Sequence, residues 1–127
     1  MIPSAAMIIE DTQGRILLLK RGMTAPWMPG KWNLPGGGGD LGETPAETAI
    51  REALEETALR VFQPVFVTIE DLGPDVGILE IYHSRYYSGT VKICWESSEH
   101  AWVPKAEALS YDLVPGIAGA IEKITHP

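Results

Sequence analysis

Hydrophobic residues along the first third of the chain fall in short runs separated by polar, glycine-containing breaks. Residues 5–9 and 15–21 form two such runs, and the break between them contains Gly14. Two short apolar runs around a polar turn predict a β-hairpin, and their nearly continuous hydrophobicity predicts burial on both faces. Residues 22–39 hold three of the ten prolines and six of the thirteen glycines, which indicates a loop with a short strand at 31–34.

The clearest helix signal covers residues 44–57. Thr44 is a suitable N-cap, Pro45 occupies the first helical position, and Glu47 follows the cap by three residues, which together form a capping box. Apolar positions recur every three or four residues and predict one buried stripe. These positions are Ala46, Ala49, Ile50, Ala53, Leu54 and Thr57.

The remaining pattern predicts strands and a closing helix. Strands are expected at 61–69, 77–87 and 91–95, with a shorter one at 101–103. A helix is expected over residues 113–124, with Pro115 in its first turn. Strands before, between and after two helices predict an α/β (α+β) fold, a mixed β-sheet with helices packed on its faces. The length of 127 residues predicts a single domain over 1–127.

Composition argues against some classes of binding partner and indicates a cellular compartment. The net charge of −7 disfavours nucleic-acid polymers and anionic membrane surfaces, because both are bound through an excess of Lys and Arg. No apolar run is long enough to span a bilayer, and the N-terminus lacks the pattern of a signal peptide. Cys94 is the only cysteine, so no internal disulfide can form. A cytoplasmic location is expected, and the sequence leaves open a monomer or a homodimer.

Three glutamates of the expected helix carry the first candidate chemistry. Glu52, Glu55 and Glu56 stand at i, i+3 and i+4 and share one helix face. One interpretation is a solvated acidic face on which Arg51 pairs with Glu47 and Glu55. The other is a site for a hard divalent cation, because Mg²⁺ takes oxygen ligands and keeps waters that substrate phosphates can replace.

The glycine-rich loop just before this helix favours the second interpretation. Residues 34–43 include four consecutive glycines, Gly36 to Gly39, and lead into the helix N-terminus. Backbone amides and the helix dipole favour anions there, and glycine lets a backbone carbonyl approach a metal closely. No Lys-Ser/Thr pair follows, so this is not a Walker loop. A loop suited to phosphate beside a helix face suited to metal outlines a pyrophosphate site.

The spacing of these residues resembles the Nudix box, Gly-x5-Glu-x7-Arg-Glu-U-x-Glu-Glu-x-Gly-U with U aliphatic. Gly37, Glu43 and the segment 51–59 (Arg-Glu-Ala-Leu-Glu-Glu-Thr-Ala-Leu) match six of its seven fixed identities. The lead-in, residues 30–32 and 34–37, is also similar to the family's. Ala53 replaces a larger aliphatic residue, and Ala58 replaces the final glycine. Either Ala58 adopts a left-handed conformation, at a cost of roughly 1 kcal/mol, or the helix runs one residue further.

The resemblance implies a Nudix-like α/β/α sandwich and a site for Mg²⁺ or Mn²⁺. In the family's pattern, the ligands would be Glu52, Glu55 and Glu56 with the carbonyl of Gly36. Arg51 and Glu43 would form a charge-assisted pair that holds the ligand face.

A later carboxylate often completes such sites in the family. Glu96 and Glu99 are the two candidates, and the spacing of Glu96 from Trp102 favours Glu96. For the substrate, Arg21 is a candidate phosphate contact, Trp27 a candidate stacking residue, and Gly37 a candidate backbone contact. Ordinary surface charge and ordinary packing are the alternatives for Arg21 and Trp27.

The implied activity is cleavage of a diphosphate bond in a nucleoside diphosphate linked to another group, with a MutT-like nucleoside triphosphate pyrophosphohydrolase as a narrower form. One alternative is a catalytically idle Nudix-fold domain that binds or senses a nucleotide. Another is an isoprenoid diphosphate isomerase, for which the single cysteine, Cys94, gives little support.

Overall fold

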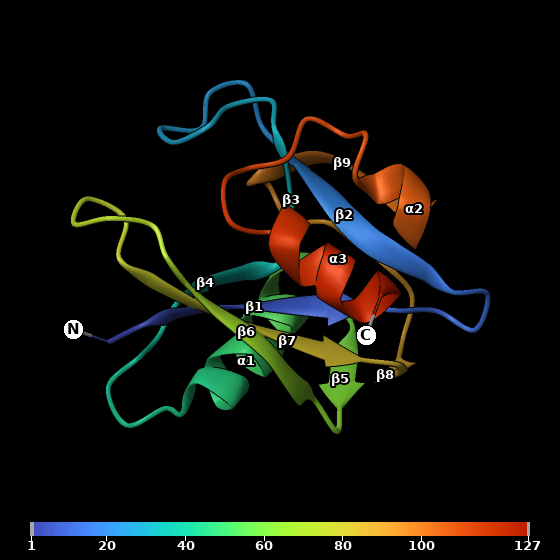
Figure 1. Cartoon of the computed structure of the whole chain (residues 1–127), viewed down its shortest axis with the longest axis horizontal. Coiled ribbons are helices and arrows are strands. Elements are labelled where there is room, and N and C mark those ends of the chain that lie inside the picture. Colours follow the sequence, from blue (N-terminus) through green and yellow to red (C-terminus); the bar gives the residue numbers. More distant parts are fainter. Residues whose placement is uncertain (1, 127) are drawn as a thin grey trace.

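The computed structural model describes residues 2–126, and its strands form three sheets (Figure 1). The largest has four strands in the order β4-β1-β7-β6. Strands β1 and β7 run parallel, whereas the β1–β4 and β6–β7 pairs are antiparallel, so this sheet is mixed. Its strands are β1 (Ser4–Ile9), β4 (Gly36–Gly38), β6 (Val65–Asp71) and β7 (Ile78–Ser84).

Two smaller sheets and three helices complete the described part of the chain. One sheet has the order β3-β2-β9 and the other pairs β5 with β8. These strands are β2 (Arg15–Arg21), β3 (Trp32–Asn33), β5 (Arg60–Phe62), β8 (Tyr86–Ser88) and β9 (Ser97–Pro104). The helices are α1 (Pro45–Thr57), α2 (Lys105–Ala108) and α3 (Ala118–Thr125). Among residues 2–126, no helix has the length and apolar character needed to cross a bilayer.

Strand β1 lies between two helical layers, α1 on one face and α3 on the other (Figure 1). Met7 and Ile9 belong to a buried cluster that includes Ala49 and Ala53 of α1. Ala6 and Ile8 belong to a second cluster that includes residues of α3. Side chains alternate between the faces of a strand, so a run without polar residues is buried on both sides. The expected α/β/α sandwich and the two-sided burial are confirmed.

The predicted hairpin of residues 5–9 and 15–21 is wrong. The two runs form β1 and β2, but these lie in different sheets and share only an isolated bridge between Glu10 and Ile16. A tight turn joins them, in which Asp11 N–H donates to the Arg15 carbonyl at 2.8 Å. Strand β1 pairs instead with β4 and β7, while β2 pairs with β3 and β9. Local patterning predicted the strands and the turn but not their partners.

Several predicted boundaries in the second half are also wrong. The run 61–69 divides into β5 and β6 around Gln63, whose φ is 50°. The run 77–87 divides into β7 and β8 at Arg85. The strand predicted at 101–103 is longer than expected, because β9 covers Ser97–Pro104. Residues 91–95 form no strand, because this segment instead bonds to the end of α1. Lys92 N–H donates to the Thr57 carbonyl at 2.8 Å.

The closing helix begins later than predicted. Residues 113–116 are irregular, and Val114 N–H donates to the Trp32 carbonyl at 2.9 Å. Gly116, with φ of 96°, then turns the chain before α3 starts at Ala118. Pro115 therefore lies outside the helix, and the short helix α2 was not predicted.

Helix α1 follows the prediction at its start and departs from it along its buried face. Thr44 Oγ1 accepts from Glu47 N–H at 3.2 Å and Thr44 N–H donates to Glu47 Oε1 at 2.9 Å, which confirms the capping box. Leu54 is 37% exposed, so it lies outside the buried stripe. The buried positions are Thr48, Ala49, Ala53 and Thr57.

The end of α1 gives a stability prediction. Ala58 has φ of 65° and lies in the left-handed region, where the missing glycine of the motif would be unstrained. We expect Ala58→Gly to raise the free energy of unfolding by up to about 1 kcal/mol, measured by chemical denaturation. Ala46→Gly, inside the first turn of the same helix, is the control and should lower it. A destabilised Ala58→Gly variant would contradict this account of the helix end.

Candidate metal and active site

The site forms where α1 crosses the glycine strand β4. Glu52 and Glu56, one turn apart on α1, face Gly36 and Gly37. A Cβ atom built on Gly37 would lie 2.7 Å from the carboxyl carbon of Glu52, so the Glu52 carboxyl group occupies the space that a side chain at this position would need. The backbone of Gly36 lies beside the Glu56 carboxyl group, and its N–H acts to lower the pKa of that group. Two carboxyl groups of α1 therefore lie against a segment of β4 that has no side chains.

The Glu52–Glu56 pair is electrostatically unfavourable when both groups are ionised. Burial, a hydrogen bond with Glu52 and the charge of Glu52 raise the pKa of Glu56 to about 9, and the charge of Glu96 adds to the effect. The Gly36 N–H acts in the opposite direction. Two carboxyl groups that repel each other when ionised mark a place where a cation would relieve the repulsion. The donor set, all oxygen, fits Mg²⁺ or Mn²⁺.

Arg51 holds the neighbouring carboxylates in place. Its Nε donates to Glu43 Oε2 at 2.6 Å and its Nη2 to Glu43 Oε1 at 3.1 Å, a two-point contact. Its Nη1 donates to Glu52 Oε1 at 2.9 Å, and Nη2 also donates to the Gly38 carbonyl at 2.9 Å. Hydrogen bonds from Arg51 hold the pKa of Glu43 at about 2, and the same contacts raise the pKa of Arg51. One guanidinium therefore joins the glycine strand, the loop and the helix.

Glu55 does not join the pair. Its side chain is 56% exposed, and Arg51 Nη1 donates to both of its oxygens at 3.2 Å. Glu47 is not a partner of Arg51, because its carboxylate accepts from Thr44. Within residues 2–126, no group of three or more His, Cys, Asp or Glu side chains is arranged to hold a metal ion. The structure thus brings together Glu52 and Glu56 and leaves Glu55 at the rim.

The two later glutamates lie in different surroundings. Glu96 lines a small cavity of about 40 Å³ together with Glu56, and its charge acts on Glu56. Glu99 lies opposite Lys20 in the β2–β9 pairing and forms an ion pair with it at 3.9 Å. Of the two, Glu96 is the one that faces the carboxyl pair.

Comparison with known proteins agrees with this geometry. The sequence profile of the NUDIX domain matches residues 2–124, nearly the whole chain. The chain belongs to the Nudix hydrolase family. It is 34% identical over 113 residues to the CMP-5'-(N-acetyl-N-hydroxy-3-aminopropyl)phosphonate hydrolase of Streptomyces rubellomurinus, covering 84% of this chain and 53% of that protein. The chain spans about half the length of that curated relative.

Two solved structures share the fold over almost the full chain. The MutT protein of Methanosarcina mazei Go1 is 26% identical with a TM-score of 0.85, covering 98% of this chain and 92% of that one. The ORF135 protein of E. coli is 27% identical with a TM-score of 0.84, covering 98% of this chain and 89% of that one. These structures confirm the Nudix fold.

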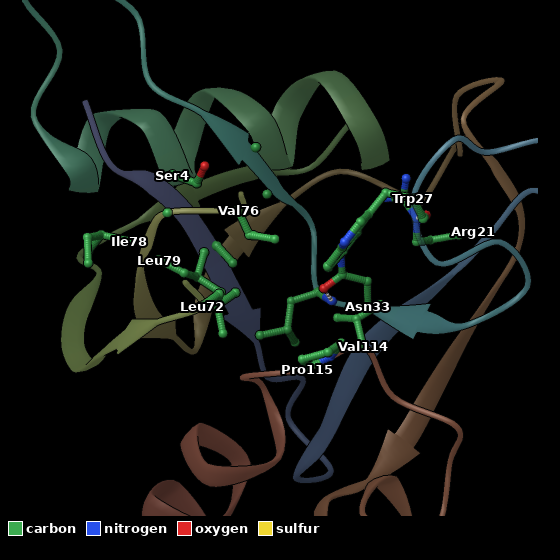
Figure 2. A pocket seen from close by; sticks show the side chains of 15 residues that line it. Ser4, Arg21, Trp27, Asn33, Leu72, Val76, Ile78, Leu79, Val114 and Pro115 are labelled. Carbon is green, nitrogen blue, oxygen red and sulfur yellow. Dashed lines mark hydrogen bonds between the residues drawn. The ribbon is translucent and has the colours of Figure 1, made fainter. Parts of the chain in front are cut away.

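This Nudix chain has a larger cavity of about 220 Å³ (Figure 2). Its lining includes Gly36 and Gly37, the two glycines that face the carboxyl pair. It shares Arg21, Asn33, Leu34 and Gly36 with the small cavity that contains Glu56 and Glu96. The two hollows therefore have a common wall.

All three residues singled out for the substrate, Arg21, Trp27 and Gly37, line the larger cavity. Arg21 Nε donates to the Trp27 carbonyl at 2.6 Å, and its guanidinium lies 5.3 Å from the centre of the Trp27 ring. No pattern in the sequence indicated the aliphatic part of the lining, which comes from Leu72, Val76, Leu79, Val114 and Pro115. Asn33 was also missed as a lining residue, although it lies between the two segments of the motif's lead-in.

The raised pKa of Glu56 predicts a pH-dependent response to metal. Because this carboxyl holds its proton more tightly in the folded state than in the unfolded chain, its contribution to stability falls as pH rises from about 4.5 towards about 9. Mg²⁺ binds the ionised pair, so we expect the increase in Tm caused by Mg²⁺ to grow over this interval. Thermal melts in EDTA and in Mg²⁺ measure it, with Glu56→Gln as the comparison. An equal Mg²⁺ effect at every pH would contradict the assignment.

Proposed function

We propose that this chain is a divalent-metal-dependent hydrolase that cleaves a diphosphate bond in a nucleoside diphosphate linked to another group. The observation that carries the proposal is the Glu52–Glu56 pair, which adjoins a cavity of about 220 Å³. A nucleoside triphosphate, cleaved as by MutT-like pyrophosphohydrolases, is the narrower candidate. Two similar proteins, a CMP-linked phosphonate hydrolase and a MutT protein, support the same class of substrate.

The metal would be held by Glu52 and Glu56, with Glu96, Glu55 and the Gly36 carbonyl as the remaining candidate ligands. Bound Mg²⁺ or Mn²⁺ would offset diphosphate charge and polarise the attacking water. Arg51 and Glu43 keep the ligand face in position through their two-point contact. Arg21, which lines both cavities, is the candidate contact for a phosphate of the substrate.

In the proposed reaction the oxygen of a water molecule bonds to one phosphorus as the bond from that phosphorus to the bridging oxygen breaks. The water gives up one proton to a carboxylate supplied by Glu52, Glu56 or Glu96, and the leaving phosphate departs with the bridging oxygen. Loop geometry rather than the helix pair would then determine which group is accepted beyond the diphosphate.

A substrate panel tests this function. Wild-type protein is incubated with Mg²⁺ or Mn²⁺ and nucleoside triphosphates, ADP-ribose, other nucleotide sugars or dinucleoside polyphosphates, and released phosphate or pyrophosphate is measured. We expect turnover of at least one class, abolished by EDTA and restored by excess Mg²⁺. Binding of these compounds without turnover would favour the catalytically idle nucleotide-binding domain. Neither binding nor turnover would reject both functions.

A further inference from the structure

We propose that a separate cavity of about 320 Å³, at the β6 edge of the four-stranded sheet, binds a small phosphate monoester that carries an apolar group. In the strand order β4-β1-β7-β6, this edge is the one opposite the glycine strand β4. Among the described residues, its lining has none in common with the two hollows beside the carboxyl pair. The inference therefore stands independently of the proposed function.

The polar part of this cavity is basic. It is lined by His83 at the end of β7, by Arg85 just after that strand, and by Lys123 of α3. In the part of the chain that the structure describes, no Asp or Glu contributes to the lining. Grouped cations without lining acids stand out in a chain whose net charge is −7, and they create a local field that attracts anions.

A buried carboxylate next to the cavity holds two of the basic side chains. Glu10 is 4% exposed, and its Oε2 lies 3.4 Å from Arg85 Nε and accepts from Lys105 Nζ at 3.1 Å. Burial raises the pKa of Glu10, but hydrogen bonds from Lys105 and His83 outweigh burial and hold the pKa below its ordinary value. An ionised carboxylate only accepts, so His83 Nε2, 2.8 Å from Glu10 Oε1, carries the proton of this contact.

The charges around the cavity do not cancel. Glu10 offsets one of the three permanent positive charges of Arg85, Lys105 and Lys123, so the equivalent of two remains. Burial lowers the pKa of the His83 imidazole, which therefore adds no permanent charge. A phosphate monoester carries close to two negative charges at neutral pH, whereas a carboxylate carries one. The balance of charge thus favours the monoester.

Both permanent cations of the lining keep donors for such a group. Lys123 Nζ donates to Oγ1 of the buried Thr68 at 2.7 Å, which fixes the ammonium and leaves two of its N–H groups. Arg85 meets Glu10 through Nε, and within residues 2–126 no hydrogen bond engages its two Nη groups. A guanidinium fork of this kind fits two phosphate oxygens at once.

The rest of the lining is apolar and partly open to solvent. Val65 and Phe66 of β6 line the cavity and are 65% and 52% exposed. Tyr82 packs against the Phe66 ring edge to face, with the ring centroids 5.8 Å apart. A ligand that covers these side chains removes apolar surface from water, which inorganic phosphate alone is too small to do. The cavity therefore fits a phosphate joined to an apolar or aromatic group.

Phenyl phosphate tests the inference, with inorganic phosphate and phenol as its two halves. Each is titrated into ¹⁵N-labelled protein in EDTA, so that no divalent ion draws phosphate to the carboxyl pair, and amide shifts are followed by NMR. We expect saturable shifts at His83, Arg85 and Lys123, and a Kd for phenyl phosphate at least about tenfold below that for either half. No saturation, shifts centred on Gly36 and Gly37, or a Kd equal to that of either half would overturn the proposal.

Four substitutions locate the binding. Arg85→Gln and Lys123→Gln each remove a lining charge and should raise the Kd for phenyl phosphate about tenfold. Arg60→Gln and Lys92→Gln remove the same charges from exposed positions outside this lining, and their Kd should stay within about twofold of wild type. Circular dichroism establishes that each variant is folded. Equal weakening in all four variants would mean that overall charge rather than this cavity binds the anion.

Discussion

Glu56→Gln is expected to lower kcat/KM for the preferred diphosphate substrate by about 10²- to 10³-fold. The substitution keeps the size of the side chain but removes the charge that a divalent ion requires, and such ions contribute several kcal/mol to transition-state stabilisation. The same variant should melt at a higher temperature than wild type in EDTA above neutral pH, because the neutral amide avoids the repulsion from Glu52 that raises the pKa of Glu56.

Glu47→Gln is the matched control for this experiment. Glu47 lies on the same helix and carries the same charge, and glutamine can replace it in the capping box at Thr44. We expect its kcat/KM to stay within about twofold of wild type, since ordinary surface substitutions have small effects. If Glu56→Gln and Glu47→Gln lost activity equally, the effect would be one of overall charge, and the assigned role of Glu56 would be wrong.

Gly37→Ala is expected to lower kcat/KM by about 10- to 100-fold and to weaken Mg²⁺ binding. The added methyl would lie 2.7 Å from the carboxyl carbon of Glu52 and 2.8 Å from one of its oxygens, so the carboxylate must shift from its present position. Displacing a metal ligand, or the group that orients it, has effects of this size. Steady-state kinetics and Mg²⁺ titration measure the two losses.

The neighbouring glycine provides the control for Gly37. A Cβ atom on Gly38 would have no heavy atom within 4 Å, and both residues belong to the same strand, β4. Gly38→Ala should therefore keep wild-type kinetics, and both variants should be folded by circular dichroism. Equal losses in both variants would mean that flexibility of the strand, rather than the space beside Glu52, determines activity.

The helix-borne part of the site could be predicted because a helix converts spacing into geometry. Glu52 and Glu56 are one turn apart in the sequence and lie together in space. The pairing of Arg51 with Glu43 was implied by the motif, and the structure has both contacts. The motif's final glycine left two possibilities at Ala58, a left-handed residue or a longer helix, and the structure has the left-handed residue.

Spacing alone did not determine which way the third glutamate turns. Glu55 shares the helix face with Glu52 and Glu56, yet its side chain extends to solvent and contacts Arg51. An ion pair with Arg51, four residues earlier, is as accessible to the Glu55 side chain as a position beside Glu52 and Glu56. A bound cation would alter that balance, so its role as a ligand stays a prediction.

Long-range pairing was the main part of the fold that the sequence did not predict. The runs that became β1 and β2 were expected to pair with each other, but both are buried on two faces and each lies between two other strands. The large cavity could not be predicted for the same reason, since Asn33, Leu72 and Val114 come from three segments that lie far apart in the sequence. Nothing in the local pattern of any one segment indicates the other two.

The most direct test of the metal site is an isothermal titration of Mg²⁺ into EDTA-treated, nucleotide-free protein at about pH 8. Wild type, Glu56→Gln and Glu47→Gln are compared under identical conditions. If the Glu52–Glu56 pair holds the ion, wild type and Glu47→Gln will bind Mg²⁺ with the same Kd, and Glu56→Gln will bind at least about tenfold more weakly. An unchanged Kd in Glu56→Gln would contradict the assignment of this pair as the metal site.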